Sequence, residues 1–218
     1  MNSLLPSFHF LYRGIRRLGI VDVTQLMHLP SGELQDQRRT DGYEIRGIQA
    51  DELSELIQSK RVSEQVGNAQ ALEDGRHAVL AAFHGDRAVS FVWFANRTVA
   101  AADNYSRASH LGTSIDMPDG TVFVYNAWTD PDHRGKRLIG SIMAYAIRHR
   151  VVGACSLLTS IDWTNQKSIR AFEFIGMHSL GSVVRFGRGP LQVSLTPSEA
   201  ERLGVRVGAD APGYRVAF

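Results

Sequence analysis

The spacing of apolar and polar residues between positions 121 and 150 predicts a strand, a tight turn and a helix, in that order. Val122 and Val124, with aromatic residues around them, indicate a buried strand that Pro131 ends. A short apolar run, Ala154 to Ile161, predicts a further strand parallel to the first. After Gly135, apolar residues recur at helical spacing: Leu138, Ile139, Ile142, Met143, Ala146 and Ile147.

Regular patterns also precede this unit. Residues Tyr43 to Ile48 alternate and predict a strand, and Ala50 to Ile57 predicts the helix that follows it. Two apolar runs, Ala78 to Phe83 and Ala88 to Phe94, predict strands joined by a hairpin turn that contains Gly85. This order of strand, helix, strand and strand suits a mixed sheet.

The two ends of the chain predict additional elements. Apolar residues between Phe8 and Leu18 recur at helical spacing, and Ile20 to Leu29 reads as a strand. Near the other end we expect a short helix between Pro197 and Gly204 and a strand from Gly213 to Phe218. The chain therefore divides into an N-terminal helix and strand extension (1–40), a core (41–190) and a C-terminal helix and strand extension (191–218).

The segment from Asn96 to Gly120 is long for a connection between strands. In an enzyme of this organisation it would lie where it covers the acceptor site. A surface loop without a role is an equally good interpretation.

Composition narrows the function classes. The 24 Lys and Arg residues nearly balance the 22 Asp and Glu residues, so the chain lacks the excess positive charge typical of nucleic-acid binding. The single cysteine, Cys155, excludes intramolecular disulfides and a cysteine zinc cluster, and we expect it to be a buried, inert thiol. No HExxH or comparable spacing occurs, so no metal site is expected. No apolar run is long enough for a membrane span and the N-terminus lacks a secretory pattern, so we expect a cytoplasmic protein.

The turn between the strand and the helix has the chemistry of an anion site. Its residues Arg134, Gly135 and Lys136 place two cations beside the free backbone N–H groups of a helix N-terminus. A pyrophosphate is the anion that suits this arrangement best.

Two motifs, in order and with a strand between them, resemble those of the Gcn5-related N-acetyltransferases. Residues Pro131 to Lys136 resemble the family's acyl-coenzyme A loop, R/Q-x-x-G-x-G/A after V-x-P, with Arg137 and Ile139 where the family has small residues. The downstream motif, N-x-x-A-x-x-x-Y-x-x-x-G-F, is matched in register by Asn165, Ser168, Phe172, Gly176 and Met177. The resemblance covers about Tyr43 to Gly189 and implies an α/β fold, with a mostly antiparallel mixed sheet flanked by helices.

The resemblance also implies an activity, the transfer of acetyl from acetyl-coenzyme A to an amine by direct attack. Backbone groups at Trp128 and Thr129 would then hold the pantetheine arm, and Asn165 would face its thiol end together with Ser168 and Phe172. The pyrophosphate would be bound by the loop and first helical turn: Arg134, Gly135, Lys136, Arg137, Leu138 and Ile139.

The position of Phe172 is where many family members have a tyrosine that protonates the leaving thiolate. Phenylalanine has no proton to donate, so another group would have to serve. The candidates are Tyr125 on the strand and His110 or Tyr105 in the long segment.

Two alternatives remain open at this stage. Bulky residues in the phosphate loop and a basic N-terminal helix would suit a donor on acyl carrier protein, with longer acyl chains. A protein that binds acyl-coenzyme A without catalysis would also fit the missing tyrosine. The acceptor, a small-molecule or protein amine, is not defined by the sequence, and a homodimer is compatible with it.

Overall fold

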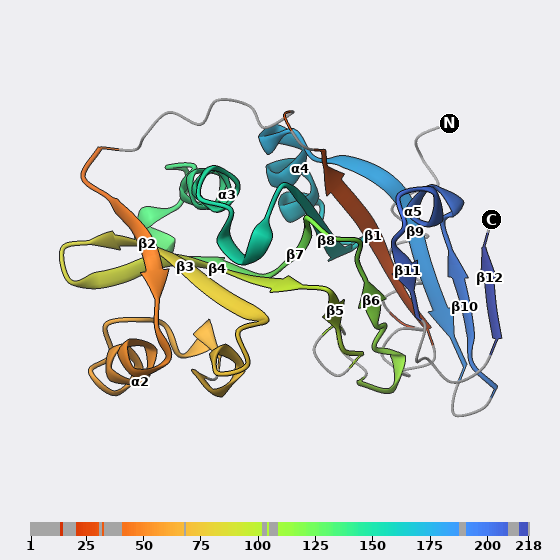
Figure 1. Cartoon of the computed structure of the whole chain (residues 1–218), viewed down its shortest axis with the longest axis horizontal. Coiled ribbons are helices and arrows are strands. Elements are labelled where there is room, and N and C mark those ends of the chain that lie inside the picture. The colour runs from red at the N-terminus through yellow and green to blue at the C-terminus, as the bar shows by residue number, and fades with distance from the viewer. Residues whose placement is uncertain are drawn as a thin grey trace.

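The chain builds one large mixed sheet with helices on both faces (Figure 1). The structure, a computed structural model, describes residues 14, 21–30, 32, 41–67, 69–101, 104, 109–187, 191–208 and 214–217. The strands of the large sheet are β1 (Val21–Leu29), β2 (Glu44–Ile48), β3 (His77–His84), β4 (Arg87–Asn96), β7 (Thr121–Thr129), β8 (Ser156–Asp162), β9 (His178–Phe186), β10 (Val193–Thr196) and β12 (Tyr214–Ala217).

The strand order is β12-β10-β9-β1-β8-β7-β4-β3-β2. Neighbouring strands are antiparallel except for two pairs, β7 with β8 and β10 with β12. A small second sheet is built from β5 (Thr98–Val99), β6 (Ile115–Asp116) and β11 (Arg206–Val207). The predicted long segment from Asn96 to Gly120 thus contains two short strands, β5 and β6, among its described residues.

Helices α3 (Leu138–Arg148) and α4 (Gln166–Ile175) cover one face of the large sheet, and α2 (Ala50–Gln58) lies on the other (Figure 1). The main apolar cluster joins α3 and α4 to strand residues such as Val122, Val124 and Leu157. Their neighbours along the strands, such as Phe123 and Leu158, point to the opposite face and pack beneath the small sheet. A third cluster packs α2 on the hairpin of β3 and β4.

Short helical elements complete the description. They are α5 (Ser198–Arg202) and the 3-10 turns η1 (Glu64–Val66), η2 (Ala69–Leu72), η3 (Ser109–Leu111), η4 (Pro131–His133) and η5 (Val151–Gly153). The predicted core strands and helices are all present, with bounds within a few residues of those expected.

Strand β1 lies in the middle of the sheet, although its residues belong to the predicted N-terminal extension. It pairs antiparallel with β8 on one side and β9 on the other. Its residues Leu26, Met27 and Leu29 are fully buried. The extension therefore contributes a central strand, because an alternating apolar segment can fill a gap in a sheet wherever it stands in the chain. The predicted helix between Phe8 and Leu18 falls outside the described residues apart from Gly14.

Three smaller observations bear on the sequence predictions. Cys155 is a free thiol and is half-buried, so the expectation of full burial is wrong; its backbone N–H donates to the Gly120 carbonyl. Among the described residues, none of the helices is long and apolar enough to cross a bilayer. Over that same part of the chain, no group of three or more His, Cys, Asp or Glu side chains is arranged to hold a metal ion.

Candidate active site

The parallel strands β7 and β8 separate part-way along their length. Their ladder runs from Thr121–Ser156 to Val124–Thr159 and goes no further, and the Thr159 hydroxyl closes it by donating to the Val124 carbonyl at 2.8 Å. On its other side β7 stays paired with β4 as far as Thr129. The second half of β7 therefore presents one backbone edge to the gap between the two strands.

A β-bulge explains the separation. Asn126 and Ala127 of β7 lie opposite the single residue Val92 of β4, and Asn126 has a positive φ of 44°. Its side-chain amide donates to the carbonyls of Gln65 at 2.9 Å and Val66 at 3.2 Å, which holds the bulge against η1. Because a bulge bends and twists its strand, β7 turns away from β8 at this point.

The gap holds a cavity of about 300 Å³, which we call the wedge cavity. It is lined by both strands, by α4 with its N-cap, and by one residue between β5 and β6: Asn104, Phe123, Val124, Tyr125, Asn126, Ala127, Thr159, Ser160, Ile161, Asp162, Asn165, Ser168 and Phe172. Four predicted site residues, Tyr125, Asn165, Ser168 and Phe172, are thus brought together. Asn165 caps α4 by accepting a hydrogen bond from the Ser168 N–H at 3.2 Å. Phe172 is buried and belongs to the main apolar cluster.

Tyr125 has a partner that the sequence did not indicate. Its hydroxyl lies 2.8 Å from Nδ1 of His77, the first residue of β3. The two rings meet edge to face with centroids 5.9 Å apart, and both side chains are half-buried. A hydroxyl paired with an imidazole can exchange a proton with it, which gives Tyr125 a route for acid chemistry. The two residues stand far apart in the chain, so no local motif links them.

The loop before α3 is exposed and carries free backbone donors. Residues 134–137 are exposed, and Gly135 and Arg137 both have positive φ, of 78° and 57°. Among the described residues, no hydrogen-bond acceptor is present for the N–H groups of Gly135, Arg137, Leu138 and Ile139. These donors stand at the N-terminus of α3, where the helix dipole favours negative charge. Such an arrangement of exposed donors can bind an anion.

The bulky side chains of Arg137, Leu138 and Ile139 pack against α4 and the apolar core. The Arg137 guanidinium lies over the Phe174 ring of α4, 4.6 Å from its centroid. Leu138 is buried in the core, and Ile139 is half-buried against the main apolar cluster. Positive φ at Arg137 explains why a glycine suits this position in the resembling loop motif.

The two cationic side chains Arg134 and Lys136 form hydrogen bonds with neighbouring residues. Arg134 donates from Nε to the Thr129 carbonyl at 3.2 Å. Lys136 donates to the Tyr43 hydroxyl at 2.8 Å, and the same hydroxyl lies 2.8 Å from Nδ1 of His133. His84 adds a third ring to this group, 5.2 Å from that of His133. The sequence did not indicate that Tyr43 and His84 approach the loop.

Three other predicted residues lie outside the lining of the wedge cavity. Trp128 stacks on Phe91 with ring centroids 5.5 Å apart, and Thr129 shares a 2.8 Å hydrogen bond with Ser90 at the end of β7. His110 is exposed in η3, and its carbonyl accepts a hydrogen bond from the Gln192 amide at 2.9 Å. Tyr105 falls outside the described residues.

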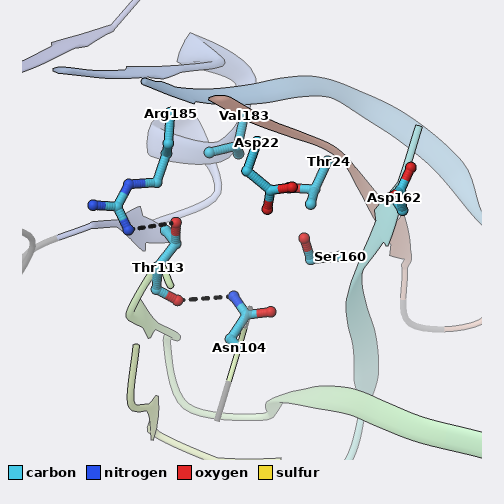
Figure 2. Close-up of a pocket in the computed structure, with 8 residues that line it drawn as sticks. All are labelled: Asp22, Thr24, Asn104, Thr113, Ser160, Asp162, Val183 and Arg185. Carbon is cyan, nitrogen blue, oxygen red and sulfur yellow. Dashed lines mark hydrogen bonds between the residues drawn. The ribbon is translucent and has the colours of Figure 1, made fainter. Parts of the chain in front are cut away.

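A smaller polar pocket of about 60 Å³ adjoins the wedge cavity and shares Asn104, Ser160 and Asp162 with it (Figure 2). Its other lining residues come from β1, from β9 and from the segment just before β6: Asp22, Thr24, Thr113, Val183 and Arg185. We call it the polar pocket. Sequence reasoning missed it because its residues come from five separated parts of the chain.

Arg185 of β9 is the most deeply buried charge in the described part of the chain, only 2% exposed. It donates to the Thr113 hydroxyl at 3.2 Å and to Oε1 of Gln192 at 2.5 Å (the Thr113 bond is drawn in Figure 2). Asp22 stands directly opposite on β1. Burial lowers the pKa of the Arg185 guanidinium, and the charge of Asp22 partly offsets this.

No family model matches the chain, and no curated protein matches it. Solved structures share its fold. A functionally unknown conserved protein from Staphylococcus epidermidis aligns with 80% of this chain and 65% of its own, with a TM-score of 0.52 and 15% identity. A GCN5-related N-acetyltransferase from Kribbella flavida aligns with 79% of this chain and 61% of its own (TM-score 0.49, 14% identity). A putative GNAT acetyltransferase from Novosphingobium aromaticivorans aligns with 75% and 62% (TM-score 0.48, 14% identity).

The present chain thus spans only 61–65% of the length of these three structures. At such identities the likeness concerns the fold and leaves activity open. The chain has a mixed sheet in which the parallel strands β7 and β8 separate part-way, with α3 between them in the chain, and its fold is similar to that of the Staphylococcus epidermidis protein. The fold class predicted from the sequence is confirmed.

Proposed function

We propose that the protein is an N-acyltransferase that moves an acyl group, acetyl in the first instance, from acyl-coenzyme A to an amine. The observation that carries this proposal is the opening of β7 from β8 next to the exposed donors at the start of α3. An extended pantetheine arm can pair with the unpaired edge of β7 as an added strand would. Its pyrophosphate would then meet the N–H groups of residues 135–139, beside Arg134 and Lys136.

The reaction balances within this site. The neutral amine nitrogen attacks the thioester carbonyl, a C–N bond forms and the C–S bond breaks. The nitrogen loses a proton to a base or to solvent, and the leaving thiolate gains one. We assign the second step to Tyr125, which lines the wedge cavity and whose hydroxyl is hydrogen-bonded to His77. Phe172 also lines the wedge cavity, but its ring has no proton to donate to the thiolate. His110, outside the cavity lining, stays a prediction from the sequence alone.

Calorimetric titration with acetyl-coenzyme A tests the donor site. We expect micromolar binding that Arg134→Ala weakens about tenfold, because a charge-assisted contact to a phosphate is lost. The exposed residue Arg202, whose partner is Glu199, provides the matched control, and Arg202→Ala should leave the affinity unchanged. Absence of binding would overturn the proposal.

A second titration separates the alternatives. If a long-chain acyl group on acyl carrier protein binds and acetyl-coenzyme A does not, the donor is a carrier protein. Binding of acetyl-coenzyme A without transfer to any amine in a broad acceptor screen would favour a non-catalytic acyl-coenzyme A-binding protein.

A further inference from the structure

The polar pocket lies on the face of the large sheet opposite α3 and α4. Its lining residue Val183 belongs to the apolar cluster beneath the small sheet. On β8, Ser160 and Asp162 follow Leu158 of the same cluster at intervals of two residues, which places them on that face as well. Both also line the wedge cavity, so the pocket communicates with the centre proposed for acyl transfer. An acceptor can therefore occupy the polar pocket while the donor extends from the start of α3 on the other face.

A row of charged and hydroxyl side chains crosses the pocket. Arg185 of β9 stands opposite Asp22 of β1. Thr24, two residues along β1 on the same face, stands opposite Asp162 of β8. Figure 2 shows Arg185 and Asp162 at opposite ends of this row, with Asp22 and Thr24 between them. The guanidinium thus has one carboxylate beside it, and the second carboxylate stands at the end that the wedge cavity shares.

The buried guanidinium of Arg185 has one donor without an acceptor. Its two terminal nitrogens donate to Thr113 and Gln192. Its Nε is buried and has no hydrogen-bond partner in the part of the chain that the structure describes. A buried donor without an acceptor is costly, and most so on a charged group. The occupant that suits this pocket therefore offers an acceptor atom, which an ammonium group lacks.

The charge of the lining disfavours an anion as that acceptor. Asp22 and Asp162 outnumber the one cation, Arg185, so the lining carries a net charge of −1. A carboxylate of the ligand would lie near two like charges. A hydroxyl group meets both conditions, because its oxygen accepts a hydrogen bond from a guanidinium and its proton can be donated to a carboxylate. A carboxylate accepts several hydrogen bonds, so Asp22 can accept this one in addition to its other contacts.

The size of the pocket limits the occupant to a small group. A cavity needs about 10–15 Å³ to hold one water molecule. The polar pocket, at about 60 Å³, therefore has room for a hydroxyl group and the carbon that bears it. The wedge cavity, at about 300 Å³, can hold the rest of a small acceptor.

We propose that the polar pocket binds a hydroxyl group of the acceptor, so that the preferred acceptors are amino alcohols. Arg185 and Asp22 would hold the hydroxyl while the amine, at the other end of the molecule, reaches the thioester beside Tyr125. The hydroxyl would take over the hydrogen bonds that a water molecule can make in the same place. This inference rests on the proposed acyl transfer.

A matched series of acceptors tests it. Amino alcohols with a hydroxyl and an amine at the two ends of a chain of three to six carbons are compared with alkylamines that carry a methyl group in place of the hydroxyl. With acetyl-coenzyme A at saturation, we expect kcat/KM of the best amino alcohol to exceed that of its alkylamine by about 10- to 100-fold, the range for hydrogen bonds to charged groups. The diamine and the amino carboxylate of the same length should both fall below the amino alcohol, since neither satisfies the donor and the carboxylates together.

Two variants locate the effect. Arg185→Lys keeps the positive charge and removes the Nε–H group, and Asp22→Asn keeps the shape and replaces the carboxylate. Each should reduce the preference for the hydroxyl about tenfold, and the affinity for acetyl-coenzyme A should change less than about twofold. Arg206→Lys and Asp119→Asn, at exposed positions, are the matched controls and should leave the preference unchanged. If Arg185→Lys does not fold, Asp22→Asn decides alone.

The outcomes separate the two proposals. Equal kcat/KM for amino alcohols and alkylamines at every chain length, a preference for the diamine or the amino carboxylate, or a hydroxyl preference that survives both substitutions would overturn the inference and leave acyl transfer standing. If no amine of the series is acetylated, calorimetry tests each proposal by itself. Failure of acetyl-coenzyme A to bind overturns acyl transfer. For the pocket the amino alcohols are titrated alone: binding that Asp22→Asn weakens supports the hydroxyl site, whereas no binding, or binding that this variant leaves unchanged, overturns it.

Discussion

The loop before α3 and the polar pocket differ in how the chain builds them. The loop is one continuous stretch, exposed to solvent, and its donors are backbone groups that any sequence with the right turn can supply. The polar pocket is assembled from β1, β8, β9 and two segments between strands, and its charges are side chains that burial makes costly. The loop therefore depends on backbone conformation and is predictable from adjacent residues, whereas the pocket depends on particular side chains that only folding brings together.

Substitution of Arg185, the buried cation of the polar pocket, should have the largest effect on the free energy of unfolding. Arg185→Ala removes the partner of Thr113 and Gln192 and leaves Asp22 without the charge opposite it. We expect the free energy of unfolding to fall by about 3–5 kcal/mol, measured by denaturant titration. The exposed residue Arg206 provides the comparison, and Arg206→Ala should cost less than about 0.5 kcal/mol. Equal losses of unfolding free energy in Arg185→Ala and Arg206→Ala would show that the buried guanidinium contributes no more to stability than an exposed one.

Substitution of Tyr125 should distinguish an effect on catalysis from an effect on donor binding. Tyr125→Phe keeps the ring that packs on Phe123 and Trp93 but removes the hydroxyl paired with His77. We expect kcat to fall about 100-fold because a positioned proton donor is lost. The dissociation constant of acetyl-coenzyme A should change less than about twofold, since the loop before α3 is untouched.

The two readouts for Tyr125→Phe are steady-state kinetics and calorimetry. A loss of donor affinity equal to the loss of turnover would show that Tyr125 binds the donor instead of protonating the thiolate. His77→Gln, which alters the partner and keeps the tyrosine, should lower kcat and change its pH profile.

Backbone conformation is the constraint on the exposed loop. Gly135 has a φ of +78°, and a Cβ added there would meet open space. Gly135→Ala should therefore cost about 1 kcal/mol of unfolding free energy through the backbone conformation alone. At Gly47, where φ is ordinary and the nearest side-chain atom would be 3.6 Å away, Gly47→Ala should be close to neutral. A neutral Gly135→Ala would indicate that the loop has no such constraint.

The smallest effect belongs to an exposed ion pair far from the polar pocket. Arg46 donates to both carboxylate oxygens of Glu52, at 2.9 and 2.5 Å, and this bonding lowers the pKa of Glu52. A lowered pKa in the folded state adds stability at neutral pH, and this stability is lost as pH falls through that pKa. Because both side chains are about one third exposed, Glu52→Gln should cost only about 0.5 kcal/mol at pH 7.

Thermal unfolding at several pH values checks this last prediction. The difference between the wild-type protein and Glu52→Gln should shrink as pH falls through the lowered pKa of Glu52, where the wild-type carboxylate takes up a proton. Glu173 is exposed on α4, and Glu173→Gln is the control for the same substitution at a surface position. A difference that grows on acidification would contradict the sign of the pKa change.

The sequence by itself determined the main elements and the exposed loop before α3. Alternation and helical spacing are local properties, so the strand Thr121–Thr129, the turn at Gly135 and the following helix could be predicted from adjacent residues. The two motifs likewise placed Asn165, Ser168 and Phe172 on a helix that meets the wedge cavity.

Only the tertiary structure decided how distant residues combine. It inserted Val21–Leu29 between β8 and β9, paired Tyr125 with His77, and set Asp22 opposite Arg185. A residue's neighbours across a sheet depend on strand order and register, and these follow from the packing of all strands together. Pairings of this kind leave no periodic or spacing signal in the chain, which is why the polar pocket emerged from the fold alone.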